Sequence, residues 1–270
     1  MDDLQPQSDP RFDELLDYNR QQRAWRGLIL TGAEITLRSD LPLLAQKAKQ
    51  AGFEHIRIQS HGMRLANPAY CETLIAAGVD EFFISMPAAS EALHDQITGI
   101  PGSRRKTLNG LLNLEDYPHV RVITNTVVTR ENYHQLSEVV RIMTEYQRLQ
   151  RMEFWHYWPM HEHDQKGLIA RHLDVLPHLT EAIELALAKG RAVEIKNFPQ
   201  CLLGARGELM VNRQPQLFID PKFWPQFERN GFYQCVHREQ CAATECLGLN
   251  QAYRDQFGDE SDVLAPILRV

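Results

Sequence analysis

The stretch Leu28-Ile-Leu-Thr-Gly-Ala-Glu-Ile-Thr-Leu37 decides the fold of this chain. It opens as an apolar run, passes through a turn of small residues and reaches the carboxylate of Glu34 before a helical segment. The apolar run predicts a buried strand over residues 27–31. A small-residue turn that ends in a carboxylate is suited to holding an amino group of a ligand. We therefore expect a strand whose carboxyl end carries a binding turn.

Strands and helices alternate outward from this segment at a spacing of roughly 30 residues. The sequence pattern predicts helices at 9–24, 40–51, 68–77, 90–97, 104–114, 131–149 and 175–189. It predicts strands at 27–31, 55–59, 80–86, 120–128, 152–158 and 192–196. This alternation is typical of a parallel sheet with right-handed crossovers. No Gly-x-Gly-x-x-Gly follows the first strand, which favours a curved or partial barrel over a dinucleotide-binding sheet.

Composition excludes several classes of protein. With 270 residues and 43% hydrophobic content, the chain can bury one sizeable core. A net charge of -6 and a pI near 6.0 argue against a nucleic-acid surface held by bulk charge. No apolar run approaches the length of a membrane span, and the acidic first residues resemble neither a signal nor a transit peptide. We expect a cytoplasmic protein.

Polar residues gather at the carboxyl ends of the predicted strands, where parallel barrels place their active sites. Any one of these residues is as consistent with an ordinary polar strand end as with a ligand contact. Together they predict a ring of hydrogen-bonding groups around a ligand. The residues are Thr31, Gly32, Glu34, Gln59, Ser60, His61, Ser85, Asn125, Thr126, His156, Tyr157, Lys196 and Asn197.

Five segments in order resemble radical S-adenosylmethionine enzymes, over residues 9–197. They are Thr31-Gly-Ala-Glu34, Ala51-Gly-Phe-Glu-His-Ile-Arg-Ile-Gln-Ser-His-Gly62, Gly78-Val-Asp-Glu-Phe-Phe-Ile-Ser85, His94-Asp-Gln-Ile-Thr-Gly-Ile-Pro-Gly-Ser103 and Asn125-Thr-Val-Val-Thr129. The resemblance implies an α/β fold in which residues 1–197 form a partial (β/α)6 TIM-like barrel lacking its first strand. Residues 198–270 would form a cysteine-rich extension.

The resemblance also implies cofactors and a reaction. A [4Fe–4S] cluster would donate an electron to S-adenosylmethionine, the sulfonium bond would break, and a 5′-deoxyadenosyl radical would take hydrogen from a substrate. Gly32, Ala33 and Glu34, in the turn that Thr31 opens, would contact the methionine amino group, with Ala33 standing where a glycine is usual. The methionine carboxylate and the ribose would be contacted by Ser60, His61, Ser85 and Asn125.

One departure from the family is large, because its Cys-x3-Cys-x2-Cys motif is not among these residues. Cys71 stands alone on a predicted helix, where we expect a small buried residue. Without three thiolates the cofactor-binding cluster has no ligands. We interpret the chain as beginning after the first strand and its cysteine loop, by natural truncation or a misassigned start, and as inactive alone. The alternative is a non-catalytic binding or accessory protein on a degenerate barrel.

The tail carries a second candidate site at Cys201, Cys235, Cys241 and Cys246, with 33, 5 and 4 intervening residues. Four thiolates suit an iron–sulfur cluster or zinc, and the structural alternative is unligated thiols in a compact cap. The tail resembles the auxiliary-cluster extension of some enzymes of the family. His156, His161 and His163 offer another metal site, as in a metal-dependent hydrolase, against the simpler reading of a solvated or substrate-facing loop.

Partners are predicted only by class. Trp155, Tyr157, Phe223 and Trp224 indicate a moderately apolar substrate, either a peptide or a ring-bearing small molecule. An active enzyme of this family would also need an electron donor.

Overall fold

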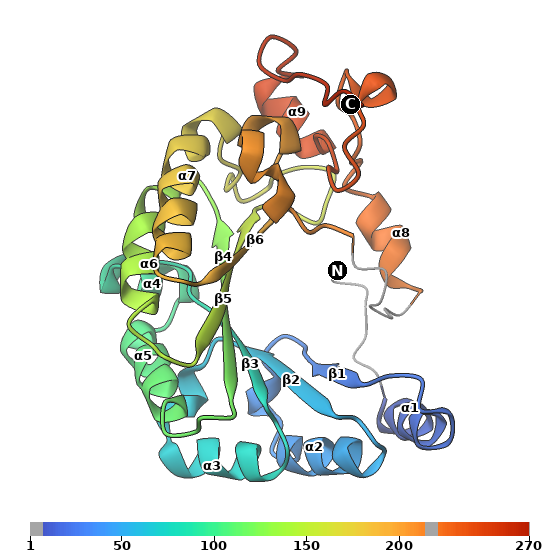
Figure 1. Cartoon of the computed structure of the whole chain (residues 1–270), viewed down its shortest axis with the longest axis vertical. Coiled ribbons are helices and arrows are strands. Elements are labelled where there is room, and N and C mark those ends of the chain that lie inside the picture. The colour runs from blue at the N-terminus through green and yellow to red at the C-terminus, as the bar shows by residue number, and fades with distance from the viewer. Residues whose placement is uncertain (1–7, 214–220, 270) are drawn as a thin grey trace. The chain divides into compact units, whose positions relative to one another are not determined.

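The computed structural model describes residues 8–213 and 221–269 and contains a six-stranded sheet in the order β1-β2-β3-β4-β5-β6 (Figure 1). Each strand lies beside its sequence neighbour, and the first three pairs run parallel. β1 and β6 are not neighbours, so the sheet is open among the described residues. The strands are β1 (Gly27–Leu30), β2 (His55–Ser60), β3 (Glu81–Ser85), β4 (Arg121–Val128), β5 (Leu149–His156) and β6 (Ala192–Lys196). This confirms the predicted α/β barrel-type fold.

Helices connect the strands close to the predicted positions. They are α1 (Asp9–Gln22), α2 (Leu41–Gln50), α3 (Pro68–Ala76), α4 (Glu91–Thr98), α5 (Ser103–Leu114), α6 (Leu136–Met143), α7 (His172–Ala188), α8 (Phe223–Glu228) and α9 (Gln251–Phe257). The helix predicted at 131–149 was wrong in extent. The Asn132 side chain accepts the backbone N–H of Thr129 at 2.7 Å and holds a turn there, and Leu149 already belongs to β5.

The chain divides into two compact units. Among the described residues, the N-terminal unit holds those up to Asn125 together with Ile142–Arg151, and the C-terminal unit holds Thr126–Arg141 and those from Met152 onward. The predicted domain boundary between residues 197 and 198 falls inside the C-terminal unit. The division into a partial barrel and a cysteine-rich extension stays a prediction.

Register assigns the side chains of the N-terminal unit to two sheet faces. Ser60 pairs with Ile84, and Ser85, one residue further along β3, pairs with Asn125. Because neighbouring residues of a strand point to opposite faces, Ser60 lies on the other face from Ser85 and Asn125. Ile84 is fully buried, so the face that it shares with Ser60 is packed in the core.

The tail has an apolar core of its own. Ile169, Leu249, Ala252, Tyr253 and Leu264 form a buried cluster against which Cys201 and Cys235 pack. This cluster gives the tail a source of order that its sequence pattern did not reveal. Hydrophobic burial of this kind stabilises a compact segment without any ligand.

A buried polar network ties the end of the tail to the start of α7. The carboxylate of Glu260 accepts hydrogen bonds from the Tyr253 hydroxyl and from Nε of Arg171, each at 2.8 Å. The Tyr253 hydroxyl in turn accepts the backbone N–H of His172 at 2.9 Å, and the two rings stack at 4.0 Å. The network therefore joins residues that lie about 90 positions apart in sequence.

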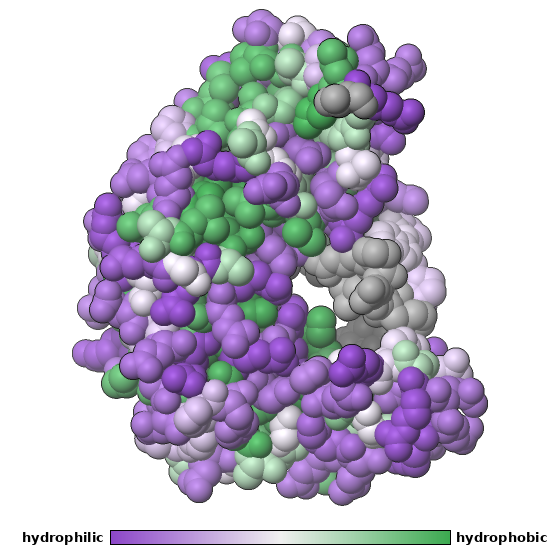
Figure 2. Space-filling model, viewed as in Figure 1, coloured by the Kyte–Doolittle hydropathy of each residue, from purple (hydrophilic) through white to green (hydrophobic). Residues whose placement is uncertain are grey.

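The surface over α1 is predominantly hydrophilic (Figure 2). Exposed ion pairs such as Arg11–Glu14 and Lys47–Asp13 lie there. Within the described ranges, no helix combines the length and the apolar character needed to cross a bilayer.

Candidate functional site

Glu34 organises the turn that follows β1. One carboxylate oxygen accepts the backbone N–H of Thr36 at 3.0 Å and the hydroxyl of Ser60 at 2.8 Å. The other accepts the backbone N–H of His61 at 2.9 Å. The carboxylate thus caps the 3₁₀ helix η1 (Ile35–Leu37) and joins the end of β1 to the end of β2.

The surroundings of Glu34 keep its carboxylate ionised. Burial alone would raise the pKa of Glu34, but hydrogen bonds from the turn and from the end of β2 outweigh burial and lower that pKa. Nε2 of His61 lies 3.1 Å from the same carboxylate. The acceptor positions of Glu34 are therefore largely used within the chain. Its clearest role is to shape the turn, and direct contact of its carboxylate with a ligand stays a prediction.

The backbone of the turn is what remains accessible. Thr31, Gly32 and Ala33 are exposed, and a Cβ built on Gly32 would meet no atom within 4 Å. The contrast within this unit is Gly110, where a Cβ would lie 2.6 Å from the carbonyl oxygen of Gly62. Gly110 is needed for close packing, whereas nothing in the described chain fills the space beside Gly32. The space beside Gly32 is therefore open and accessible.

A polar row follows the same edge of the sheet. The Thr31 hydroxyl donates to the side-chain oxygen of Gln59 at 2.8 Å, and Gln59 shares its sheet face with Ser85 and Asn125. Gln59 was recognised at the sequence level as a polar strand end but was given no place in the cofactor site. The alternation of side chains along a strand indicates that Gln59 and Ser60 point to opposite faces of the sheet. Which of the two residues faces the ligand side depends on pairing with distant strands, which the sequence alone does not reveal.

In this polar row, the side-chain amide of Asn125 lacks a hydrogen-bond partner among the described residues. The residue is 5% exposed, and its side-chain nitrogen is buried. An unpaired buried amide nitrogen costs about 1–3 kcal/mol. Its strand partner Ser85 is exposed, so the position lies beside accessible space. A ligand with acceptor atoms would satisfy this group.

Ser60 lies apart from that row. Its hydroxyl donates to Glu34 and accepts the backbone N–H of Gly62 at 2.9 Å. It shares a sheet face with buried Ile84 and is 6% exposed. These contacts give Ser60 a role in supporting the turn, while its predicted contact with a ligand carboxylate or ribose is untested.

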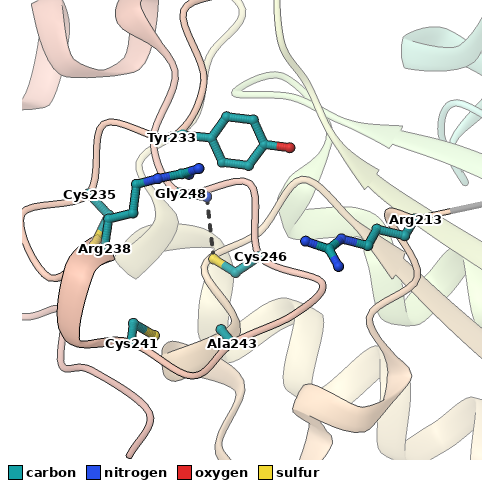
Figure 3. A pocket seen from close by; sticks show the side chains of 8 residues that line it. All are labelled: Arg213, Tyr233, Cys235, Arg238, Cys241, Ala243, Cys246 and Gly248. Carbon is teal, nitrogen blue, oxygen red and sulfur yellow. Dashed lines mark hydrogen bonds between the residues drawn. The ribbon is translucent and has the colours of Figure 1, made fainter.

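The tail cysteines gather around a cavity of about 190 Å³ (Figure 3). Cys235, Cys241 and Cys246 line it together with Arg213, Tyr233, Arg238, Ala243 and Gly248. The Arg238 guanidinium stacks over the Tyr233 ring at 4.0 Å. Cys201 packs against the neighbouring apolar cluster, and burial, with a contribution from the nearby Cys246 and Cys235, raises its pKa. The fold thus brings together the four cysteines that the sequence singled out.

Backbone N–H groups point at these sulfur atoms. The N–H of Gly248 donates to Sγ of Cys246, and the N–H of Ile267 to Sγ of Cys241, each at 3.3 Å. Burial raises the pKa of Cys201 and of Cys246, and backbone hydrogen bonds partly oppose this rise. N–H donors favour the thiolate form, which is the form that binds metal, but burial outweighs them at Cys201 and Cys246. Cysteine is the residue type that iron–sulfur clusters and zinc take, so the type of donor fits a thiolate-bound metal group.

Three of the thiols line the cavity, and Cys201 packs against the neighbouring apolar cluster. Across residues 8–213 and 221–269, no three His, Cys, Asp or Glu side chains are arranged to hold an ion. The histidine region shows other contacts. Nε2 of His156 donates to the carbonyl of Ala170 at 2.9 Å, and Nδ1 of His163 lies 3.5 Å from Asp255.

The family model of the radical SAM superfamily matches residues 5–143, about half of the chain. The chain belongs to the radical SAM superfamily. The matched part includes the Glu34 turn, Ser85 and Asn125, and it ends before the cysteine tail. The cofactors expected from the resemblance, S-adenosylmethionine and a [4Fe–4S] cluster, are those of this superfamily.

Curated relatives match the chain over part of their length. A probable GTP 3′,8-cyclase of Saccharolobus islandicus is 32% identical over 113 residues, 42% of this chain and 36% of that protein. An AdoMet-dependent heme synthase of Methanosarcina barkeri is 31% identical over 120 residues, 44% of this chain and 33% of that protein. The match spans about a third of the length of each relative.

A solved structure has a similar fold over much of the chain. Native anSMEcpe with bound AdoMet and a Kp18Cys peptide aligns with a TM-score of 0.56 and 14% identity. The alignment covers 70% of this chain and 55% of that one. At this identity the likeness supports the fold alone.

Proposed function

We propose that this chain is the barrel portion of a radical SAM enzyme and binds S-adenosylmethionine at the carboxyl ends of β1 to β3 and at Asn125 of β4. The observation that carries the proposal is the unsatisfied amide of Asn125 on the same sheet edge as the open turn at Gly32. Both lie within the residues that the family model matches. Carboxyl ends of parallel strands are where barrel enzymes bind their ligands.

The residues of this chain would divide the binding between them. Backbone groups of Gly32 and Ala33 would receive the methionine amino group, with Glu34 holding the turn in shape. Asn125 and Ser85 would meet the ribose or the carboxylate. With its cluster, S-adenosylmethionine supplies the 5′-deoxyadenosyl radical of this superfamily. The chain's residues contain no Cys-x3-Cys-x2-Cys, so we expect this chain alone to bind the cofactor without cleaving it.

Titration of the purified chain with S-adenosylmethionine tests the proposal. Amide NMR shifts should change for residues of the Gly32 turn and for Asn125, which detects even weak binding. Absence of such shifts would refute the site. After anaerobic reconstitution and reduction, 5′-deoxyadenosine above background would refute the expected inactivity and, with it, the reading of the chain as a non-catalytic accessory protein.

Substitution of Gly32 separates binding from folding. Gly32→Leu should change the free energy of unfolding by no more than about 0.5 kcal/mol, because its Cβ has room. It should weaken binding of S-adenosylmethionine by about tenfold or more by filling the open space beside the turn. Gly110→Ala is the matched contrast, expected to cost about 1–3 kcal/mol by overpacking. Unchanged affinity in Gly32→Leu would contradict the site.

We also propose that Cys201, Cys235, Cys241 and Cys246 bind an iron–sulfur cluster, with zinc as the alternative occupant. Anaerobic reconstitution should leave about four iron and four sulfide ions per chain. Cys246→Ser should lose most of both, while Cys71→Ser should retain them. Cys71 is the control because it is buried in the N-terminal unit, where its thiol donates to the carbonyl of Leu65 at 3.0 Å. Bound zinc without sulfide would favour the alternative, and no metal at all would refute the site.

The substrate is proposed by class alone. Phe223 stacks on Phe227 with ring centroids 5.9 Å apart, and Trp224 is 49% exposed. An aromatic surface of this kind suits an apolar peptide side chain or a ring-bearing small molecule. An active protein of this family would draw its electron from a separate reductant.

A further inference from the structure

A short segment after β6 runs along that strand. Met210 bridges to Ile195 in parallel, and the backbone N–H of Val211 donates to the carbonyl of Ile195 at 3.0 Å. The segment therefore extends the hydrogen bonding of β6 and brings Asn212 to the carboxyl end of that strand.

Asn212 and Glu245 form a clamp between this segment and the cysteine loop. The side-chain nitrogen of Asn212 donates to the carbonyl of Glu245 at 2.6 Å. The Glu245 carboxylate accepts the backbone N–H groups of Asn212 at 2.8 Å and of Arg213 at 2.6 Å. Three hydrogen bonds thus join Glu245 to Asn212 and Arg213, which lie 33 and 32 positions before it in sequence. Hydrogen bonds to a charged group are among the stronger ones in proteins.

The other side of the clamp reaches two strand ends. The side-chain oxygen of Asn212 accepts the backbone N–H of Asn197 at 3.0 Å, directly after β6. The side-chain nitrogen of Asn197 donates to the carbonyl of His156, the last residue of β5, at 3.4 Å. Asn197 is buried and adopts a φ of 59°, a conformation that asparagine tolerates better than most residues. The ends of β5 and β6 therefore share one hydrogen-bonded chain with Glu245.

The clamp also borders the thiol cavity directly. Glu245 immediately precedes Cys246, which lines the cavity. The Arg213 side chain lines the same cavity while its backbone is held by Glu245 (Figure 3). Glu245, whose carboxylate holds Asn212 and Arg213, is therefore bonded through the peptide chain to a residue that lines the cavity.

We propose that Asn212 and Glu245 are positioning residues that couple occupancy of the thiol cavity to the geometry of the carboxyl ends of β5 and β6. The proposal rests on the tail cysteines binding a metal group, as proposed above. A connected network of hydrogen bonds can carry coupling between two places in a protein. The clamp provides such a network, because the side-chain oxygen and nitrogen of Asn212 and its backbone N–H are all engaged in this one chain of bonds.

Backbone hydrogen–deuterium exchange tests the coupling in the full chain. The probes are iron with sulfide under anaerobic conditions and, separately, Zn²⁺ alone. Loading with whichever probe binds should slow exchange at Asn197, Asn212 and Arg213 by about fivefold or more, because the clamp becomes more ordered. Metal and sulfide analysis of the same sample reports occupancy independently.

Variants distinguish coupling from a merely structural contact. In Asn212→Ala, metal content should match the wild type while exchange at Asn197 no longer responds to loading. Glu245→Ala should behave likewise, and Glu245→Gln should restore part of the response because its side-chain oxygen can still accept both N–H groups. Asn250→Ala is the control. It removes a helix cap in the same unit, where the Asn250 side chain accepts the N–H of Tyr253 at 2.9 Å, and should leave the response intact.

The outcomes separate the two proposals. Metal bound with no change in exchange at Asn197, or an undiminished response in Asn212→Ala, overturns the coupling and leaves the metal site standing. Failure of the wild-type chain to bind either probe overturns the metal site and the coupling together.

Discussion

Glu34→Ala is expected to abolish detectable binding of S-adenosylmethionine and to lower the free energy of unfolding by about 2 kcal/mol. The carboxylate is the common acceptor for donors from η1 and from the end of β2. Its removal leaves those donors without their partner and releases the turn that carries Gly32 and Ala33. The loss of binding is thus expected through the turn, whether or not the carboxylate itself touches the cofactor.

Glu34→Gln should be nearly as damaging as Glu34→Ala. An amide nitrogen in place of one carboxylate oxygen would face the backbone N–H of either Thr36 or His61, so donor would meet donor. The matched control is Glu54→Gln, because Glu54 is an exposed carboxylate of the same unit paired with Arg26. An exposed pair of this kind contributes about 1 kcal/mol or less.

Amide NMR titration with S-adenosylmethionine and thermal unfolding of the three variants check this expectation. If Glu34→Gln bound the cofactor as the wild type does, the carboxylate would not be the organiser of the turn. If Glu34→Ala folded as stably as the wild type yet failed to bind, the carboxylate would act on the ligand directly instead.

The sequence alone predicted the strands and the turn because their signals are local. An apolar run bounded by Gly27 and by the turn at Gly32 defines β1 without reference to the rest of the chain. The helix predicted at 131–149 begins later than expected, because the Asn132 side chain hydrogen-bonds the backbone of Thr129 and forms a turn in place of the first helical turn. The end of β5 was placed two residues late because Tyr157 and Trp158 prolong the apolar run beyond the strand.

The parts of the site that the sequence did not predict depend on contacts between residues far apart in the chain. Whether Ser60 or Gln59 turns toward Asn125 is fixed by register with β3 and β4, and a shift of one residue would exchange them. The four tail cysteines could be singled out by type and clustering. Their surroundings could not, because the Asn212–Glu245 clamp joins residues 33 positions apart that share no sequence pattern.

Glu260→Ala should destabilise the C-terminal unit by about 3 kcal/mol at pH 7. Burial alone would raise the pKa of Glu260, yet its hydrogen-bond donors outweigh burial and hold that pKa at about 2, against an ordinary value of 4.5. A difference of this size corresponds to about 3 kcal/mol of stability. The substitution removes the acceptor of the buried Tyr253 hydroxyl and the partner of Arg171.

The pH dependence of that difference follows from the sign of the shift. A carboxylate whose pKa is lower in the folded state stabilises it fully above the unfolded pKa and loses this contribution as pH falls toward the folded pKa. The gap in stability between wild type and Glu260→Ala should therefore stay constant from pH 7 to about 5 and narrow between pH 4.5 and pH 3. Urea unfolding followed by tryptophan fluorescence measures the gap at each pH.

Glu138→Ala provides the matched control, because Glu138 belongs to the same unit and pairs with Arg141 at 2.6 Å while 60% exposed. It should cost about 0.5 kcal/mol or less. A Glu260→Ala variant no less stable than this control would mean that the tail is held by its apolar cluster alone. A gap that widened in acid would mean that the carboxylate is protonated in the folded protein, which its hydrogen bonds from Arg171 and Tyr253 make unfavourable.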